Sequence, residues 1–402
     1  MSLQKKAVVA GFIVFFSQNV AFAENLPNKS VFDKVSTAPH TSAALTTPPP
    51  PSVEAHGYYL QDVYSGKVLG MQNPDQKMPP ASLTKLMTLY LTFEALSSNR
   101  IHLTDLVPIS EKAWRTGGSR MFVKVGDRVP LSDLLNGVIV DSGNDACVAI
   151  AEYIGGSQDS FVNLMNQQAA LLGMKNTHYL DATGLPDPNH YTSPHDQAIL
   201  SRAIILNFPQ YYPLFSQKTF TYNRITQENR NRLLFHDGTV DGLKTGHTDA
   251  AGYCLISSAK RGDMRLLSVL LGAPTDKARA EDSQSLLSYG FRFYETHKLF
   301  TKNQLIEKSP VYMGAIRLLP VGISSDIYVT VPTGQFEKIK TNIAIHTPLK
   351  APIDKDQKVG EITATLNNVN ILETNSEPLV ALEPANKGNI LRRLWDKVKL
   401  SV

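Results

Sequence analysis

The chain has little of what several large classes of protein depend on. Two cysteines among 402 residues exclude a scaffold built on disulfides. The ten histidines form no H-E-x-x-H string, and the sequence predicts neither a metal nor a cofactor. An apolar run from Ala7 to Phe16 is too short to span a bilayer as a stable helix. The formal net charge is +4, and the basic excess gathers in one C-terminal stretch, so we predict no nucleic-acid binding.

What the chain does contain is three short strings in a fixed order. They are Ser82-Leu83-Thr84-Lys85, Ser142-Gly143-Asn144 and Lys244-Thr245-Gly246. Each string alone is common in unrelated proteins. Together they supply a serine with a nearby base, a polar relay and a cationic strand. This set predicts acyl transfer from a substrate that carries a free carboxylate.

The first string predicts an activated serine. Positions three apart lie on one face of a helix, so Ser82 can present its hydroxyl to the amine of Lys85. Residues 83–96 are apolar almost all round, which predicts a buried helix and a lysine whose pKa is lowered by burial. Lys244 is the expected second cation. The ordinary alternative for a lone S-x-x-K is a helix cap and an exposed lysine, and the other two strings argue against it.

The second string predicts a proton relay and a substrate contact. We expect Ser142 beside the first string, and Asn144 hydrogen-bonded to the substrate's amide backbone. The alternative is a glycine turn with Asn144 as a cap. The polar, glycine-rich segment 114–121 is expected to be either a surface loop or a wall of the substrate groove, and we favour the wall.

The third string predicts a docking strand. Lys244 and Thr245 can bind a carboxylate, and Gly246 allows a backbone to approach closely. The main-chain amides of Ser82 and His247 are the expected oxyanion hole.

The sequence segments that contain these strings are PPASLTKLMT, VDSGNDAC and DGLKTGHTDAAGYC. They resemble the corresponding segments of the low-molecular-mass penicillin-binding proteins. Among these, the chain is similar to serine D-alanyl-D-alanine carboxypeptidases that carry a C-terminal β domain and a membrane-surface helix. The resemblance runs from about His56 to the C-terminus. It implies Ser82 as the acyl-forming nucleophile, Lys85 as the proton acceptor and Lys244 as the binder of the substrate carboxylate. It also implies a transpeptidase-like fold.

The order of elements supports the same α+β fold class. Strand pairs are predicted at 57–63 with 67–71 and at 252–259 with 264–272, followed by a helical pattern at 276–297. Strands at both ends with helices between them predict an antiparallel sheet covered by helices on both faces. Further strands at 327–331, 339–345 and 360–366 predict a small all-β C-terminal domain.

The two ends of the chain contain predicted targeting segments. Lys5 and Lys6, the apolar run and Ala21-Phe22-Ala23 predict a signal peptide, and hence export to the periplasmic face of the inner membrane. Near the C-terminus, Trp395 and other apolar residues share a helical face with several cations. This favours a peripheral membrane anchor over a terminal helix packed on the body. The predicted segments are a signal peptide (1–23), a Pro/Ser/Thr-rich disordered tether (24–55), a catalytic domain (56–300), a β-rich domain (301–384) and an amphipathic anchoring helix (385–402).

The predicted activity is removal of the terminal D-Ala from peptidoglycan stem peptides that end in D-Ala-D-Ala, which limits cross-linking. β-Lactams would acylate Ser82. A β-lactamase shares the three strings, but the region 176–191 contains Asp181 and no E-x-x-L-N. The sequence also leaves room for a D,D-endopeptidase or a non-catalytic wall-associated scaffold. We interpret Cys147 and Cys254 as buried thiols near the site and expect Cys147 to be reactive, with a disulfide left open.

Overall fold

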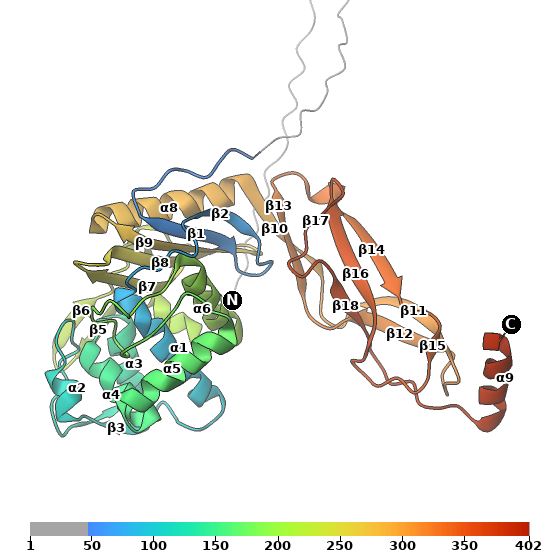
Figure 1. Cartoon of the computed structure of the whole chain (residues 1–402), viewed down its shortest axis with the longest axis horizontal. Helices are drawn as coiled ribbons and strands as arrows, with labels where there is room; N and C mark the ends of the chain where they lie inside the picture. Colours follow the sequence, from blue (N-terminus) through green and yellow to red (C-terminus); the bar gives the residue numbers. More distant parts are fainter. Residues whose placement is uncertain (1–46, 402) are drawn as a thin grey trace, which may run out of the picture. The chain divides into compact units, whose positions relative to one another are not determined.

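The structure is a computed structural model that describes residues 47–401. The predicted signal peptide and most of the predicted tether therefore lie outside the described residues. The described chain contains a catalytic domain followed by a β-rich domain and a terminal helix (Figure 1).

A five-stranded sheet in the order β2-β1-β9-β8-β7 forms the centre of the catalytic domain, and every neighbouring pair is antiparallel. This confirms the predicted sheet. Its strands are β1 Gly57–Asp62, β2 Val68–Gln72, β7 Val240–Thr248, β8 Gly252–Arg261 and β9 Met264–Ala273. β7 is an edge strand, so one row of its backbone amides and carbonyls is free for a ligand.

Helices cover both faces of the sheet, as the sequence predicted (Figure 1). Side chains alternate between the faces of a strand, and on β9 Val269 packs into one hydrophobic cluster while Leu270 packs into another. Leu286 and Leu287 of α8 fill the second cluster. The helices are α1 Lys85–Ser97, α2 Glu111–Arg115, α3 Leu131–Ile139, α4 Asn144–Gly155, α5 Gln158–Leu172, α6 Pro194–Asn207, α7 Leu233–His236 and α8 Asp276–Phe293. Short pieces complete the domain: η1 Ala81–Thr84, η2 Tyr212–Ser216, β3 Leu106–Pro108, β4 Arg128–Pro130, β5 Thr219–Tyr222 and β6 Ile225–Glu228.

The predicted helix at 276–297 is too long at its C-terminal end. α8 stops at Phe293, and residues Tyr294–Phe300 form β10, which pairs antiparallel with β13. The reason is tertiary: Thr296 is buried and its hydroxyl donates to Asp62 at the end of β1. A local helical pattern does not reveal such a contact.

The β-rich domain follows, as predicted. Its larger sheet runs in the order β14-β16-β18-β12-β11-β15, and β17 pairs with β16. Residues such as Val321, Ile362 and Leu379 form its core. Its elements are β11 Leu305–Tyr312, β12 Leu318–Ile323, β13 Ile327–Pro332, η3 Phe336–Lys338, β14 Lys340–Ile345, β15 Leu349–Lys350, β16 Lys358–Leu366, β17 Val369–Asn370 and β18 Glu377–Ala381.

The last helix, α9 Ile390–Ser401, contacts the β-rich domain through its polar side. Asp396 is buried and its carboxylate accepts a hydrogen bond of 2.6 Å from the backbone N–H of Met313. Five of the six apolar residues of the helix are instead 57% to 79% exposed; they are Ile390, Leu391, Leu394, Trp395 and Val398, while Leu400 is half-buried. Within residues 47–401 we find no helix long and apolar enough to cross a membrane.

The described end of the predicted tether, residues 47–55, has no regular secondary structure but contacts α8. The Tyr289 hydroxyl donates to the carbonyl of Pro48, and the N–H of Glu54 donates to Asp282. Ala55 is buried in the same cluster as the α8 leucines. This stretch is therefore packed on the catalytic domain and is not a free tether.

Candidate active site

The serine and the lysine of the first string meet as predicted. Ser82 lies in the 3₁₀ turn η1, and Lys85 begins α1 directly after it. Side chains three apart are eclipsed in a 3₁₀ turn. The Lys85 Nζ lies 2.8 Å from the Ser82 Oγ. Ser82 is also close to the positive end of the α1 dipole.

Burial lowers the pKa of Lys85. Lys85 is fully buried, and burial lowers its pKa to about 8. Arg230 adds to this lowering. The predicted second cation, Lys244, is also close enough to interact, because the charge of Lys85 contributes to the lowered pKa of Lys244. Cys147 and Asp181 oppose the shift. A substantial share of the lysine is thus neutral near pH 8, as a proton acceptor requires.

A loop holds the lysine from its other side. The Lys85 amine donates to the carbonyl of Thr183 over 2.8 Å. Asp181 fixes this loop by accepting hydrogen bonds from the amides of Thr183 and Gly184. Burial disfavours ionisation of Asp181, but the His190 ring, 3.7 Å away, and the hydrogen bonds from Gly184 and Thr183 outweigh it and lower the pKa to about 2. Asp181 therefore acts here as a structural anchor for the carbonyl that holds the lysine.

The second string lies beside the first. Ser142 is buried, with a positive φ of 58°, and its hydroxyl accepts a hydrogen bond of 2.9 Å from the Lys244 Nζ. Asn144 begins α4, and its side-chain amide donates to the carbonyl of Gly117 over 2.6 Å. Asn144 thus holds the 117–119 wall, and its predicted contact with a substrate amide stays a prediction.

The third string lies on the edge strand β7 but is more buried than expected. Lys244 is 2% exposed, and burial lowers its pKa well below the usual range. Its amine donates to Ser142 and to the carbonyl of Thr245, so it links the second and third strings. A Cβ on Gly246 would lie 3.2 Å from the Pro80 carbonyl and 3.3 Å from the Ser82 amide. The glycine therefore lets β7 pass close to η1.

These elements enclose a pocket of about 510 Å³. Its lining residues are Ser82, Gly118, Ser119, Ser142, Arg230, Thr245, Gly246, His247, Tyr253 and Arg279. Gly118 and Ser119 belong to the segment expected as a wall. The cations that face this pocket are Arg230 and Arg279, not Lys244. No local motif in the sequence marks either arginine or the Thr183 carbonyl, and only the tertiary fold brings them to the serine.

The two cysteines are buried free thiols, as interpreted. The expectation that Cys147 is reactive is wrong. Burial raises the pKa of the Cys147 thiol to about 11, and its sulfur donates to the carbonyl of Ala182. The reactive form of cysteine is the thiolate, and the burial of Cys147 in α4 disfavours the thiolate.

The site has a buried lysine beside a serine, a second serine hydrogen-bonded to Lys244, and a pocket faced by two arginines. These features define a serine enzyme of acyl transfer. Comparison with known proteins narrows the class. Residues 44–275 match the family model described as D-alanyl-D-alanine carboxypeptidase, and residues 294–387 match that of the C-terminal domain of penicillin-binding protein 5.

Individual proteins agree with the family models. The D-alanyl-D-alanine carboxypeptidase DacC of Escherichia coli (strain K12) is 43% identical over 90% of this chain and 92% of its own length. The crystal structure of penicillin-binding protein 5 from Haemophilus influenzae is 41% identical and covers 84% of this chain and 99% of its own, with a TM-score of 0.78. Penicillin-binding protein D2 from Listeria monocytogenes, solved in its ampicillin-bound form, is 33% identical, covers 61% of this chain and 100% of its own, and has a TM-score of 0.53.

The chain belongs to the D-alanyl-D-alanine carboxypeptidase family. It is a serine D-alanyl-D-alanine carboxypeptidase of the penicillin-binding type, with the fold that the sequence predicted.

Proposed function

We propose that catalysis proceeds through an acyl-enzyme on Ser82. Neutral Lys85 accepts the hydroxyl proton as the serine oxygen attacks the carbonyl of the penultimate D-Ala. The amides of Ser82 and His247 bind the oxyanion that forms. The observation that carries this assignment is the 2.8 Å contact between the two side chains, with the lysine fully buried.

The leaving group and the deacylation follow from the same contacts. Ser142, held by Lys244, passes a proton to the amine of the departing D-Ala as the C–N bond breaks. Water then attacks the ester, and the Ser82 hydroxyl is restored as the shortened peptide leaves. The proton that Lys85 took from the serine is available for this relay, so the proton count balances.

We assign the terminal carboxylate of the substrate to Arg230, Arg279 and Thr245, which line the pocket. This amends the sequence prediction for Lys244, because a buried lysine with a lowered pKa is a weaker partner for a carboxylate than a guanidinium. Lys244 keeps a positioning role through Ser142. β-Lactams mimic the acyl donor and would acylate the same serine.

The experiment follows free D-alanine released from a pentapeptide that ends in D-Ala-D-Ala. Wild-type protein should release it, and Ser82→Ala protein should not. Equal release by both proteins would overturn the assignment, as would no release by either one while penicillin is hydrolysed rapidly.

The proposed place of action is the periplasmic face of the inner membrane, with α9 lying on the lipid surface. The outward apolar side chains support this, as do the cations Lys387, Arg392, Arg393, Lys397 and Lys399. Deleting residues 388–402 should move the protein from the membrane fraction to the soluble fraction. As a control, Asp354→Asn on the β-rich domain should leave it on the membrane. An unchanged distribution of the deletion variant would refute the anchor.

A further inference from the structure

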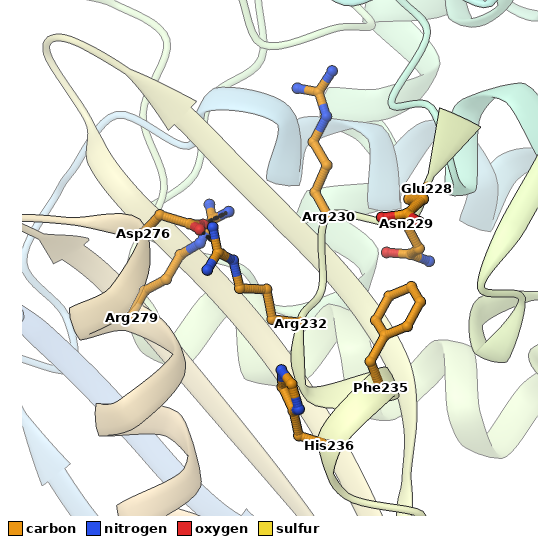
Figure 2. Close-up of a pocket in the computed structure, with 8 residues that line it drawn as sticks. All are labelled: Glu228, Asn229, Arg230, Arg232, Phe235, His236, Asp276 and Arg279. Atoms are coloured by element: carbon orange, nitrogen blue, oxygen red, sulfur yellow. Dashed lines mark ion pairs between the residues drawn. The ribbon is translucent and has the colours of Figure 1, made fainter. Parts of the chain in front are cut away.

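A second pocket, of about 590 Å³, adjoins the active-site pocket. Arg230 and Arg279 line both pockets, so the two meet at these arginines. Figure 2 shows the second pocket, in which the guanidinium of Arg232 and that of Arg279 converge on Asp276 while Arg230 stands apart. The remaining lining residues are Glu228, Asn229, Phe235 and His236.

The pocket carries an excess of positive charge. Three arginines face two carboxylates, those of Glu228 and Asp276, which leaves a formal +1 before His236 is counted. Arg230 forms no ion pair with any residue of the described range 47–401. The pocket also lies at the N-terminal end of α8, where the helix dipole favours an anion.

The arginines differ in the donors that they have left. Arg279 pairs with Asp276 through Nη2 and donates through Nη1 to the carbonyls of Gly246 and Cys254, so it adds positive charge beside Arg230 but few further donors. The Nε of Arg232 pairs with the Asp276 carboxylate at 2.6 Å, and its two terminal nitrogens do not take part in this pair. A guanidinium with two parallel N–H donors is suited to bind a carboxylate. Because Arg230 is assigned to the terminal carboxylate, Arg232, with a side chain 62% exposed, is the cation of this pocket that remains for a second anion.

We propose that the second pocket is a subsite for the side chain of the residue that the enzyme removes, and that it accepts an anionic side chain such as that of a C-terminal D-glutamate. This inference rests on the proposed function, in which the terminal carboxylate lies at Arg230 and Arg279. The side chain branches from the carbon that bears this carboxylate, so a long side chain can extend toward the pocket that shares Arg230 and Arg279. The methyl group of D-Ala carries no charge for Arg232 to bind, whereas the side chain of D-Glu carries a carboxylate.

The test uses three N-acetylated peptides that differ in their last residue: D-Ala, D-Gln or D-Glu. D-Gln matches D-Glu in size and lacks its charge. Release of the final residue gives kcat/KM for each peptide with wild-type protein, Arg232→Gln, Arg232→Lys and Arg261→Gln. Arg261 is the matched control, because it is a partly exposed arginine paired with Asp237 and does not line either pocket.

Wild-type protein should favour D-Glu over D-Gln about tenfold, mostly through KM, and less at high salt because ions screen the attraction. Arg232→Gln should reduce this preference to within about twofold. Arg232→Lys should retain only part of it, because lysine keeps the charge but loses the two parallel donors, and Arg261→Gln should retain it in full. Equal cleavage of the D-Glu and D-Gln peptides by wild type, or an unchanged preference in Arg232→Gln, would overturn the inference. Release of D-Ala with neither longer residue removed would also overturn it, while the proposed function would stand. If D-Ala itself is not released, the proposed function fails first.

Discussion

The pH dependence of acylation follows directly from the buried lysine. Lys85 must be neutral to accept the proton of Ser82, and burial lowers its pKa from 10.5 to about 8. The neutral share of a group with this pKa is about 1% at pH 6, about 10% at pH 7, about half at pH 8 and about 90% at pH 9. The acylation rate should follow these shares.

The assay is the second-order rate of acylation by a fluorescent penicillin, measured under single-turnover conditions between pH 6 and pH 9. The rate should rise about tenfold from pH 6 to pH 7 and about fivefold from pH 7 to pH 8, then level off. Lys85→Arg, which stays charged, should not be acylated at any of these values. A flat profile, or a rise that continues with unchanged slope through pH 9, would refute the reasoning.

Three further predictions concern the supports of the site. Gly246→Ala should slow acylation about tenfold or more, because a Cβ there contacts the turn that carries the nucleophile. The control Gly238→Ala, whose Cβ would have nothing within 4 Å, should leave the acylation rate unchanged. Equal stopped-flow rates for the two variants would contradict this. Asp181→Asn should lower kcat about tenfold or more with little change in KM, because the Thr183 carbonyl loses its anchor, and an equal loss in KM would argue against a positioning role. Asp141→Asn should raise Tm by about 2–4 °C above pH 7 and less at pH 5. Burial raises the pKa of Asp141 to about 7, so the carboxyl of Asp141 destabilises the folded state increasingly as pH rises from about 4 to 7. A Tm difference between Asp141→Asn and wild type that does not change with pH in calorimetry would contradict this.

The parts of the site that could be predicted from the sequence are those that local geometry controls. The spacing of Ser82 and Lys85 is a property of one turn, and the apolar residues around them indicate burial before any fold is known. The strands β8 and β9 could also be predicted, because two largely apolar runs flank the turn signal at residues 260–263.

The remaining parts depend on contacts between distant segments. Thr183 lies 98 positions from the lysine that it holds, and Arg279 is one of two arginines on α8, with no motif to distinguish it. The burial of Lys244 could not be judged from its strand, because segments outside that strand, including η1 and the loop that carries Ser142, pack against it. The end of α8 was misjudged for the same reason, since β10 forms only through pairing with β13.

The measurement that tests the central claim most directly is the mass of the acylated peptide after a brief reaction with a β-lactam. Digestion of the quenched protein should place the added acyl mass on the peptide that contains Ser82, with no added mass in Ser82→Ala protein. Acylation at Ser142 or at any other residue, or full acylation of the Ser82→Ala variant, would contradict the account.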